Sequence, residues 1–235
     1  MILKVVEQPE FDIHSFLLER KLSKRIIPIT TSFPHTIGRI IAMEEHLVLS
    51  SAPSDLFKTA GFRLAHQFLQ GVQFIHRHQV AHLDLKPDNI VIKKPAHLYI
   101  IDFSVSVRVP GPNFRMTGYQ GTKGWVAPEV EQDLDTGYCP ILADLWSTGK
   151  VLQYLTGCQD AFCGKIQYLT SQLQSPKPQQ RPLLGTIKLG ALFAPHQLNP
   201  ILKSNRRFRS DVQGSRGAKR KCAQVGTVLD PECTV

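Results

Sequence analysis

Residues 80–92, VAHLDLKPDNIVI, place a polar loop between two apolar runs. Before the loop, apolar side chains recur every three or four residues from Gly61 to Gln79, and this spacing predicts a helix. After it, residues 89–104 predict two short strands joined by a Lys-Lys-Pro turn, with Asp102 at the end of the second strand. We therefore expect the loop and Asp102 to lie at neighbouring strand ends. The polar side chains of the loop are His82, Asp84, Lys86, Asp88 and Asn89.

Oxygen-bearing side chains at these strand ends suit a magnesium ion. Asp84 and Asp102 are two carboxylates eighteen positions apart, and Asn89 adds an amide oxygen between them. Mg²⁺ takes hard oxygen ligands of this kind where it also holds substrate phosphates. Lys86 adds a positive charge to the same pocket. The loop therefore predicts a site for magnesium and phosphate groups.

Length and composition limit the kind of protein that carries this loop. With 235 residues, 42% of them hydrophobic, the chain can bury one substantial core or two small ones. Its five cysteines form no C-x-x-C pair, which favours reduced thiols and a cytoplasmic or nuclear location. The sequence shows no cleavable signal peptide and no apolar run of the ~18 residues that a membrane span needs. We therefore expect no membrane partner.

Two stretches near the amino terminus are rich in β-branched and other apolar side chains and predict strands, residues 1–6 and 39–49. Residues 11–24 lie between them and predict a short helix with a basic carboxy-terminal end. We therefore expect a small sheet with one helix ahead of the long helix and the polar loop.

Three motifs resemble those of protein kinases, in the order and spacing found in that family. HLDLKPDN at residues 82–89 resembles the catalytic loop, IIDFS at 100–104 the metal-binding D-F-G position, and GTKGWVAPEV at 121–130 the A-P-E end of the activation segment. ADLWSTGKVL at 143–152 adds the aspartate and tryptophan that kinases carry on their central buried helix. The chain is similar to members of the protein kinase superfamily, and it looks like fungal kinase-like proteins.

This resemblance implies an α+β fold: a two-lobe protein kinase-like fold with an incomplete amino-terminal lobe and a mainly helical carboxy-terminal lobe. Residues 1–50 would form the partial small lobe and the hinge, and residues 51–185 the large lobe. Residues 186–235 hold nine Lys/Arg against three Asp/Glu in a chain of net charge +9. Because this last stretch lacks apolar periodicity, we expect a basic and mostly unfolded tail.

The resemblance also implies a Ser/Thr protein kinase that transfers the γ-phosphoryl group of ATP to a protein hydroxyl. Asp84 would be the catalytic base and Lys86 would contact the phosphoryl group, while Thr122 would help to position both. Asn89 and Asp102 would bind Mg²⁺. The cofactors would then be ATP and Mg²⁺, and the partner would be a protein substrate.

Further residues would bind the nucleotide. Lys4 would stand where kinases have the strand lysine that contacts the ATP phosphates. Met43 would be the gatekeeper next to the hinge, and the backbone of Glu44 and His46 would contact adenine. Lys4 lies close to the chain start, where a lysine is commonly no more than a solvated charge.

Other positions of the family pattern concern architecture. Glu129 would pair with Arg181, and Asp144 would brace the catalytic loop from below. Two positions depart from the pattern, since Leu83 replaces the arginine of H-R-D and Ser104 the glycine of D-F-G.

The expected small lobe departs further from the kinase pattern. The sequence contains no G-x-G-x-x-G, so the glycine-rich lid over the phosphates is missing. Kinases pair the strand lysine with a helix glutamate, but alignment places His14 or Ser15 near that position, with Glu10 and Glu19 as imperfect substitutes.

Three interpretations follow. The intact polar set favours an active kinase. The missing lid and helix glutamate favour a kinase-like pseudoenzyme that acts as a binding or scaffold protein. A truncated gene model of an active kinase is the third, because the chain starts at the strand that follows the lid in kinases. Independently of these, the basic tail suggests an acidic partner or nucleic acid.

Overall fold

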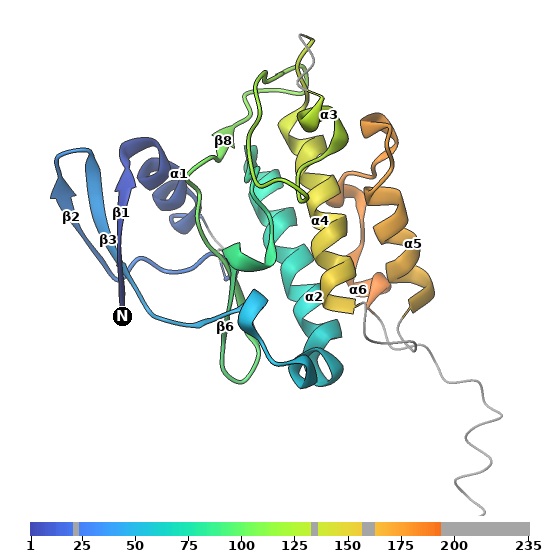
Figure 1. Cartoon of the computed structure of the whole chain (residues 1–235), viewed down its shortest axis with the longest axis horizontal. Helices are drawn as coiled ribbons and strands as arrows, with labels where there is room; N and C mark the ends of the chain where they lie inside the picture. The colour runs from blue at the N-terminus through green and yellow to red at the C-terminus, as the bar shows by residue number, and fades with distance from the viewer. Residues whose placement is uncertain (21–23, 133–135, 157–162, 194–235) are drawn as a thin grey trace, which may run out of the picture. The chain divides into compact units, whose positions relative to one another are not determined.

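The computed structural model describes residues 1–20, 24–132, 136–156 and 163–193. All of them belong to the unit Met1–Ala194. In this unit a small sheet with one helix lies on one side and a group of helices on the other (Figure 1). The predicted α+β, two-lobe kinase-like fold with a partial amino-terminal lobe is confirmed.

The sheet of the small lobe is antiparallel, with strand order β1-β3-β2. Its strands are β1 (Ile2–Glu7), β2 (Thr31–His35) and β3 (Gly38–Met43). Successive side chains of a strand point to opposite faces. Val6 is accordingly buried, and Lys4, two residues earlier, lies on the same face of β1.

Helix α1 (Gln8–Leu18) follows β1 directly, and Pro9 in its first turn favours a helix start. The helix ends six residues before the predicted end at residue 24. It ends there because the chain next joins another sheet, where Ile26 forms a parallel bridge with Ile100 and is buried.

A second sheet connects the lobes. It contains β4 (Leu47–Val48), β6 (Ile90–Lys93) and β7 (His97–Ile100) in the order β4-β6-β7. A two-stranded ladder of β5 (Val80–Ala81) and β8 (Val107–Arg108) flanks the polar loop. The predicted strand pair around a Lys-Lys-Pro turn is therefore confirmed as β6 and β7.

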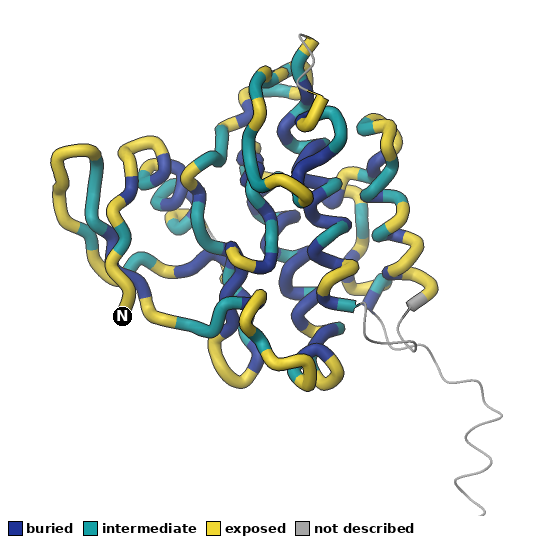
Figure 2. The backbone as a smooth tube through the Cα atoms, in the orientation of Figure 1, coloured by how far each residue is buried: buried dark blue, intermediate teal, exposed yellow. Residues whose placement is uncertain are grey.

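The large lobe is built around α2 (Ser54–Arg77), α4 (Pro140–Thr156) and α5 (Cys163–Leu173), which pack in that order. Figure 2 shows dark, buried backbone along the facing sides of α2 and α4. Leu64 and Phe68, four residues apart on α2, are both fully buried in the main core. Shorter elements complete the unit: η1 (Leu49–Ser51), η2 (Pro87–Asn89), α3 (Pro128–Glu131), η4 (Pro178–Gln180), η5 (Leu184–Thr186) and α6 (Leu189–Leu192).

Several boundaries differ from the sequence predictions. The long helix starts at Ser54 rather than near Gly61, because Phe57 continues its buried face. The predicted strand over residues 39–49 is interrupted at 44–46, where the backbone crosses from one sheet to the other. Strand β2 was not predicted, since its TSFPH sequence is polar and contains a proline.

The folded unit also extends past residue 185, where the sequence suggested that the tail begins. Leu189 and Phe193 are buried in the main core at 7% and 9% exposure. Residues 194–235, the rest of the predicted tail, lie outside the described residues. Among the described helices, none combines the length and apolar character that crossing a bilayer requires.

Candidate active site

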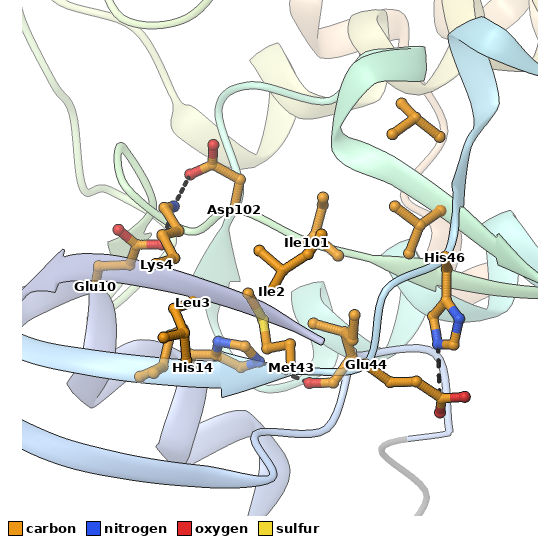
Figure 3. Close-up of a pocket in the computed structure, with 14 residues that line it drawn as sticks. Ile2, Leu3, Lys4, Glu10, His14, Met43, Glu44, His46, Ile101 and Asp102 are labelled. Atoms are coloured by element: carbon orange, nitrogen blue, oxygen red, sulfur yellow. Dashed lines mark hydrogen bonds and ion pairs between the residues drawn. The ribbon is translucent and has the colours of Figure 1, made fainter.

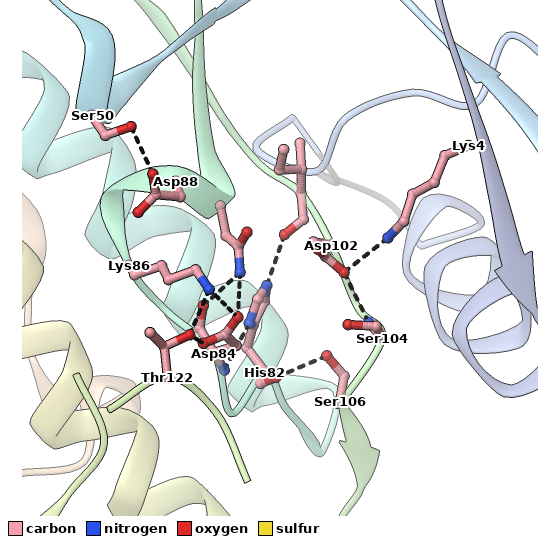
Figure 4. A network of polar contacts seen from close by, with 12 residues as sticks. Lys4, Ser50, His82, Asp84, Lys86, Asp88, Asp102, Ser104, Ser106 and Thr122 are labelled. Carbon is pink, nitrogen blue, oxygen red and sulfur yellow. Dashed lines mark hydrogen bonds and ion pairs between the residues drawn. The ribbon is translucent and has the colours of Figure 1, made fainter. Parts of the chain in front are cut away.

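The carboxylate of Asp84 is the centre of a polar cluster (Figure 4). Thr122 Oγ1 donates to Asp84 Oδ1 at 2.7 Å, and Asn89 Nδ2 donates to Asp84 Oδ2 at 2.8 Å. Lys86 Nζ lies 2.8 Å from Asp84 Oδ2 and 2.5 Å from Thr122 Oγ1. Both oxygens of Asp84 are thus held in place, while the side chain keeps 14% of its surface exposed. The structure brings together four of the residues that the sequence singled out.

The loop rests on the buried carboxylate of Asp144. Its oxygens accept the backbone N–H groups of His82 at 2.6 Å and Leu83 at 2.7 Å, and His76 Nε2 donates to it at 3.0 Å. Leu83 has a φ of +66°, a left-handed conformation that costs a non-glycine residue about 1 kcal/mol or more. The predicted brace by Asp144 is confirmed, because its hydrogen bonds hold the loop in this turn.

Lys4 reaches from β1 to two carboxylates (Figure 3). Its Nζ lies 2.6 Å from Glu10 Oε1 and 2.9 Å from Asp102 Oδ1. Glu10 is therefore the helix glutamate, and the placement of that position at His14 or Ser15 is wrong. The error arose because α1 begins immediately after β1, so that the glutamate stands only six residues after the lysine.

Electrostatics favour charged Lys4 and Asp102. Burial opposes the charge on Lys4, but hydrogen bonds to Glu10 and Asp102 outweigh it and raise the Lys4 pKa. Burial likewise acts to raise the pKa of Asp102, but the hydrogen bond and charge of Lys4 hold it below its usual value. For Glu10, burial dominates over Lys4 and the pKa is raised.

A contact of aromatic rings joins α1 to the loop. The ring of His14 lies 5.2 Å from that of Phe103, which lies 5.1 Å from that of His82. His14 Nε2 donates to the carbonyl oxygen of Ile27 at 2.8 Å. Burial lowers the pKa of His14 to about 4, so the ring is neutral at physiological pH. The sequence did not predict that His14 would contact Phe103, although His14 follows Glu10 by one helical turn.

A cavity of about 240 Å³ lies between the two sheets. Lys4 and Asp102 form its polar end, and Met43, Glu44 and His46 line it where the backbone crosses between the lobes (Figure 3). Its apolar walls include Leu3, Ile41, Val48, Val91 and Ile101. A small apolar chamber with a charged end suits a planar base attached to phosphates.

Two oxygen atoms near this polar end fit a magnesium ion. Asn89 uses its amide nitrogen on Asp84, and its amide oxygen accepts no hydrogen bond from the described residues. Asp102 accepts hydrogen bonds from Lys4 and from the N–H of Ser104 through the same oxygen, Oδ1. Asp102 also has a φ of +66°, a strained conformation of the kind that collects at functional sites.

The predicted ion pair between Glu129 and Arg181 is confirmed. The guanidinium binds the carboxylate through two bonds, Nη1–Oε1 at 2.5 Å and Nη2–Oε2 at 2.8 Å. Arg181 also donates to the carbonyl oxygen of Leu142 at 2.7 Å and is 3% exposed. This pair fastens α3 and the end of the activation segment to the large lobe.

The activation segment contacts the loop through apolar side chains. Leu83 is 4% exposed and belongs to a buried cluster with Val109 and Val126. Gly121, with a φ of +105°, passes so close to the carbonyl oxygen of Leu83 that a Cβ atom would clash. At the position where the kinase pattern has an arginine, Leu83 therefore makes apolar contacts with the activation segment.

Comparison with known proteins agrees with this architecture. The protein kinase domain family model matches residues 41–185. The chain is 36% identical over 150 residues to mitogen-activated protein kinase HOG1 of Scheffersomyces stipitis, covering 60% of this chain and 36% of that protein. It is 29% identical over 182 residues to cyclin-dependent kinase 20 of Pongo abelii, covering 72% of this chain and 51% of that protein.

The fold, the site and the family match define the class of this protein. The chain belongs to the protein kinase domain family, and its relatives include mitogen-activated and cyclin-dependent protein kinases. The matched stretch spans about a third of the HOG1 proteins of Scheffersomyces stipitis and Debaryomyces hansenii.

Proposed function

We propose that this chain is a Ser/Thr protein kinase that transfers the γ-phosphoryl group of ATP to a hydroxyl group of a protein substrate. The observation that carries the proposal is the position of the Asp84 carboxylate. It is fixed by Thr122, Asn89 and Lys86 and remains partly exposed. A carboxylate held in this way is able to orient an acceptor hydroxyl and take its proton.

The neighbours of Asp84 have separate tasks in this proposal. Lys86 places a positive charge where negative charge develops on the phosphoryl oxygens. The Thr122 hydroxyl donates to Asp84 at 2.7 Å and accepts from Lys86 at 2.5 Å, so that it holds both side chains in place. Catalysis by positioning and charge needs such fixed groups, because phosphoryl transfer asks for little covalent chemistry from the protein.

ATP and Mg²⁺ are the proposed cofactors. The amide oxygen of Asn89 and the carboxylate of Asp102 would hold Mg²⁺, which supplies charge neutralisation for the phosphates. Lys4 would contact the phosphates, since it already lies at the polar end of the cavity. The backbone of Glu44 and His46 would contact adenine between the apolar walls.

Three variants of the full chain test these assignments. Asp102→Asn should weaken Mg-ATP binding, while Asp84→Asn should leave binding nearly intact, and both should abolish radiolabel transfer from ATP to a generic basic protein. Asp88→Asn is the matched control, because Asp88 belongs to the same loop but bonds outward to Ser50 at 2.8 Å. Transfer that survives in Asp84→Asn would rule out the proposed base.

One observation favours a second function, that of a kinase-like scaffold. The 235 residues contain no G-x-G-x-x-G lid. We expect nucleotide affinity near ~1 mM, where binding contributes only about 4 kcal/mol, and turnover below the roughly 1–100 s⁻¹ of kinases. A Mg-ATP thermal shift without transfer in the unmodified chain would support the scaffold instead.

Two further proposals concern the cellular location of the chain and a partner for its basic residues. We propose a cytoplasmic or nuclear location, supported by cysteines without a disulfide pattern. The basic residues beyond 186 would bind an acidic partner or nucleic acid, supported by their excess of charge.

A further inference from the structure

A second cavity, of about 460 Å³, lies on α2 and shares no lining residue with the cavity between the sheets. One wall is formed by Lys24 and Arg25, in the segment after α1. The other is the carboxy-terminal half of α2, where Gln70, Phe74 and Arg77 recur at three and four residues and so share one helix face. Segments distant in the sequence therefore form this cavity together.

Arg25 is held rigidly in its wall. Its backbone carbonyl oxygen accepts the N–H of Ile100 at 2.7 Å. Its guanidinium donates to Gln67 Oε1 at 2.7 Å and to Gln70 Oε1 at 3.2 Å. Gly71 allows this close approach, since a Cβ there would come within 3.1 Å of Arg25 Cβ. Neutral amide oxygens thus orient this cation without cancelling its charge.

The charge of the cavity is uncompensated. Its lining includes Lys24, Arg25 and Arg77 but no Asp or Glu. None of the three forms an ion pair with a carboxylate of the described chain. The carboxy-terminal end of α2 offsets only about half a charge.

Neighbouring groups feel the same positive field. Burial lowers the pKa of Arg25; the neighbouring Tyr99 acts against this shift, and the charge of Arg63 adds to it to a smaller extent. Burial and the charge of Arg25 lower the pKa of His66. Burial is the larger cause of both shifts, and the nearby positive charges add to it because like charges placed together disfavour protonation.

We propose that this basic cavity binds a phosphoserine or phosphothreonine in a peptide segment of a partner protein. A phosphate monoester carries about two negative charges and three acceptor oxygens, which matches one fixed and two exposed cations. The rings of Phe74 and His78, 4.4 Å apart, add an apolar wall for the peptide beside the phosphate. The inference does not depend on phosphoryl transfer by the chain.

Fluorescence anisotropy of a labelled peptide tests the proposal on the full chain. The probe is a Gly/Ser-rich decapeptide with one central phosphoserine, compared with its unphosphorylated form at 150 mM salt. Lys24→Ala/Arg77→Ala should raise the Kd for the phosphopeptide about tenfold or more. Both residues are exposed, so the variant should melt like the parent chain.

The matched control is Lys165→Ala/Lys177→Ala, which removes the same charge from exposed positions elsewhere on the described unit. It should change the Kd less than twofold and so exclude nonspecific attraction, including that of the basic residues beyond 186. Equal weakening by the two double variants would overturn the proposal, as would equal affinity for both peptides. If inorganic phosphate competes as well as the phosphopeptide, molecule for molecule, the site binds phosphate alone and the peptide assignment is wrong.

Discussion

Replacing Lys4 with methionine removes the cation that Glu10 and Asp102 share, and it should lower both stability and nucleotide binding. Glu10 is 6% exposed and 2.6 Å from Lys4 Nζ, whereas Asp102 is 33% exposed. Without Lys4, burial and the charge of Asp102 still raise the pKa of Glu10, and only the backbone hydrogen bond of Phe103 opposes them, so the carboxyl should take up a proton nearer neutral pH. Lys4→Met therefore leaves one buried acid and one strained aspartate without their partner.

The magnitude lies between two limits. Breaking a fully buried pair costs about 3–5 kcal/mol, and exposed pairs contribute about 0.2–1 kcal/mol. Because Lys4 is about one third exposed, we expect a coupling energy with Glu10 of about 2 kcal/mol, screened from the buried limit. For a folded unit of this size, a loss of about 2 kcal/mol in the free energy of unfolding corresponds to a fall in Tm of roughly 4–8 °C.

A double-mutant cycle measures this coupling directly. Urea unfolding of the parent chain, Lys4→Met, Glu10→Gln and the double variant gives the pair term without the desolvation of each group. The same chain supplies a matched control in Lys93 and Glu44, whose Nζ–Oε2 distance is 2.7 Å but whose side chains are 46% and 60% exposed. The control cycle with Lys93→Met and Glu44→Gln should show no measurable coupling. Equal couplings in the two cycles would refute the view that burial makes the Lys4 pair strong.

Three other outcomes are expected. Burial lowers the pKa of His14 to about 4, so the imidazole takes up a proton in the unfolded chain at a higher pH than in the folded chain. The free energy of unfolding should therefore fall by about 3 kcal/mol as the pH drops from about 6.5 to 4. In urea titrations, His14→Gln should flatten this pH dependence, and His35→Gln, at an exposed position, should not. Phosphatase treatment should leave any turnover unchanged, because Leu83 offers a phosphorylated activation segment no charge-assisted hydrogen bond; loss of activity with Thr117 or Thr122 found phosphorylated beforehand would contradict this. A chain ending at Phe193 should melt like the full chain. A chain ending at Gly185 should lose about 3–5 kcal/mol of its free energy of unfolding through the loss of the buried Phe193 alone. Equal melting of the two shortened chains would show that residues 186–193 add no stability.

The sequence predicted the polar loop and its surroundings well because local patterns specify them. Helical spacing before residue 80, the Lys-Lys-Pro turn and the motif at 82–89 are all readable within short windows. The pair of Glu129 and Arg181 followed from family resemblance and is found as predicted.

Predictions failed where distant segments decide the outcome. Glu10 was judged an imperfect substitute because sequence spacing does not show that α1 starts at the end of β1. The contact of His14 with Phe103 joins residues 89 positions apart, which no periodicity reveals. The burial of Phe193 against α2 is equally nonlocal, so that composition alone suggested an unfolded tail too early.

The distribution of charge explains how this site keeps its form. Lys4 and Asp102 remain charged because their hydrogen bonds and opposite charges outweigh the cost of burial, which is limited by the one third of each side chain that stays exposed. His14 and Leu83, which lie inside, are neutral, and an unpaired charge at either position would cost several kcal/mol. Apolar and aromatic packing thus holds α1 and the activation segment against the loop. The charged side chains of Lys4 and Asp102 lie at the end of the cavity where phosphates would bind. An arrangement closed by packing does not require an added phosphate to stay closed, because the apolar contacts around Leu83 are present in the unmodified chain.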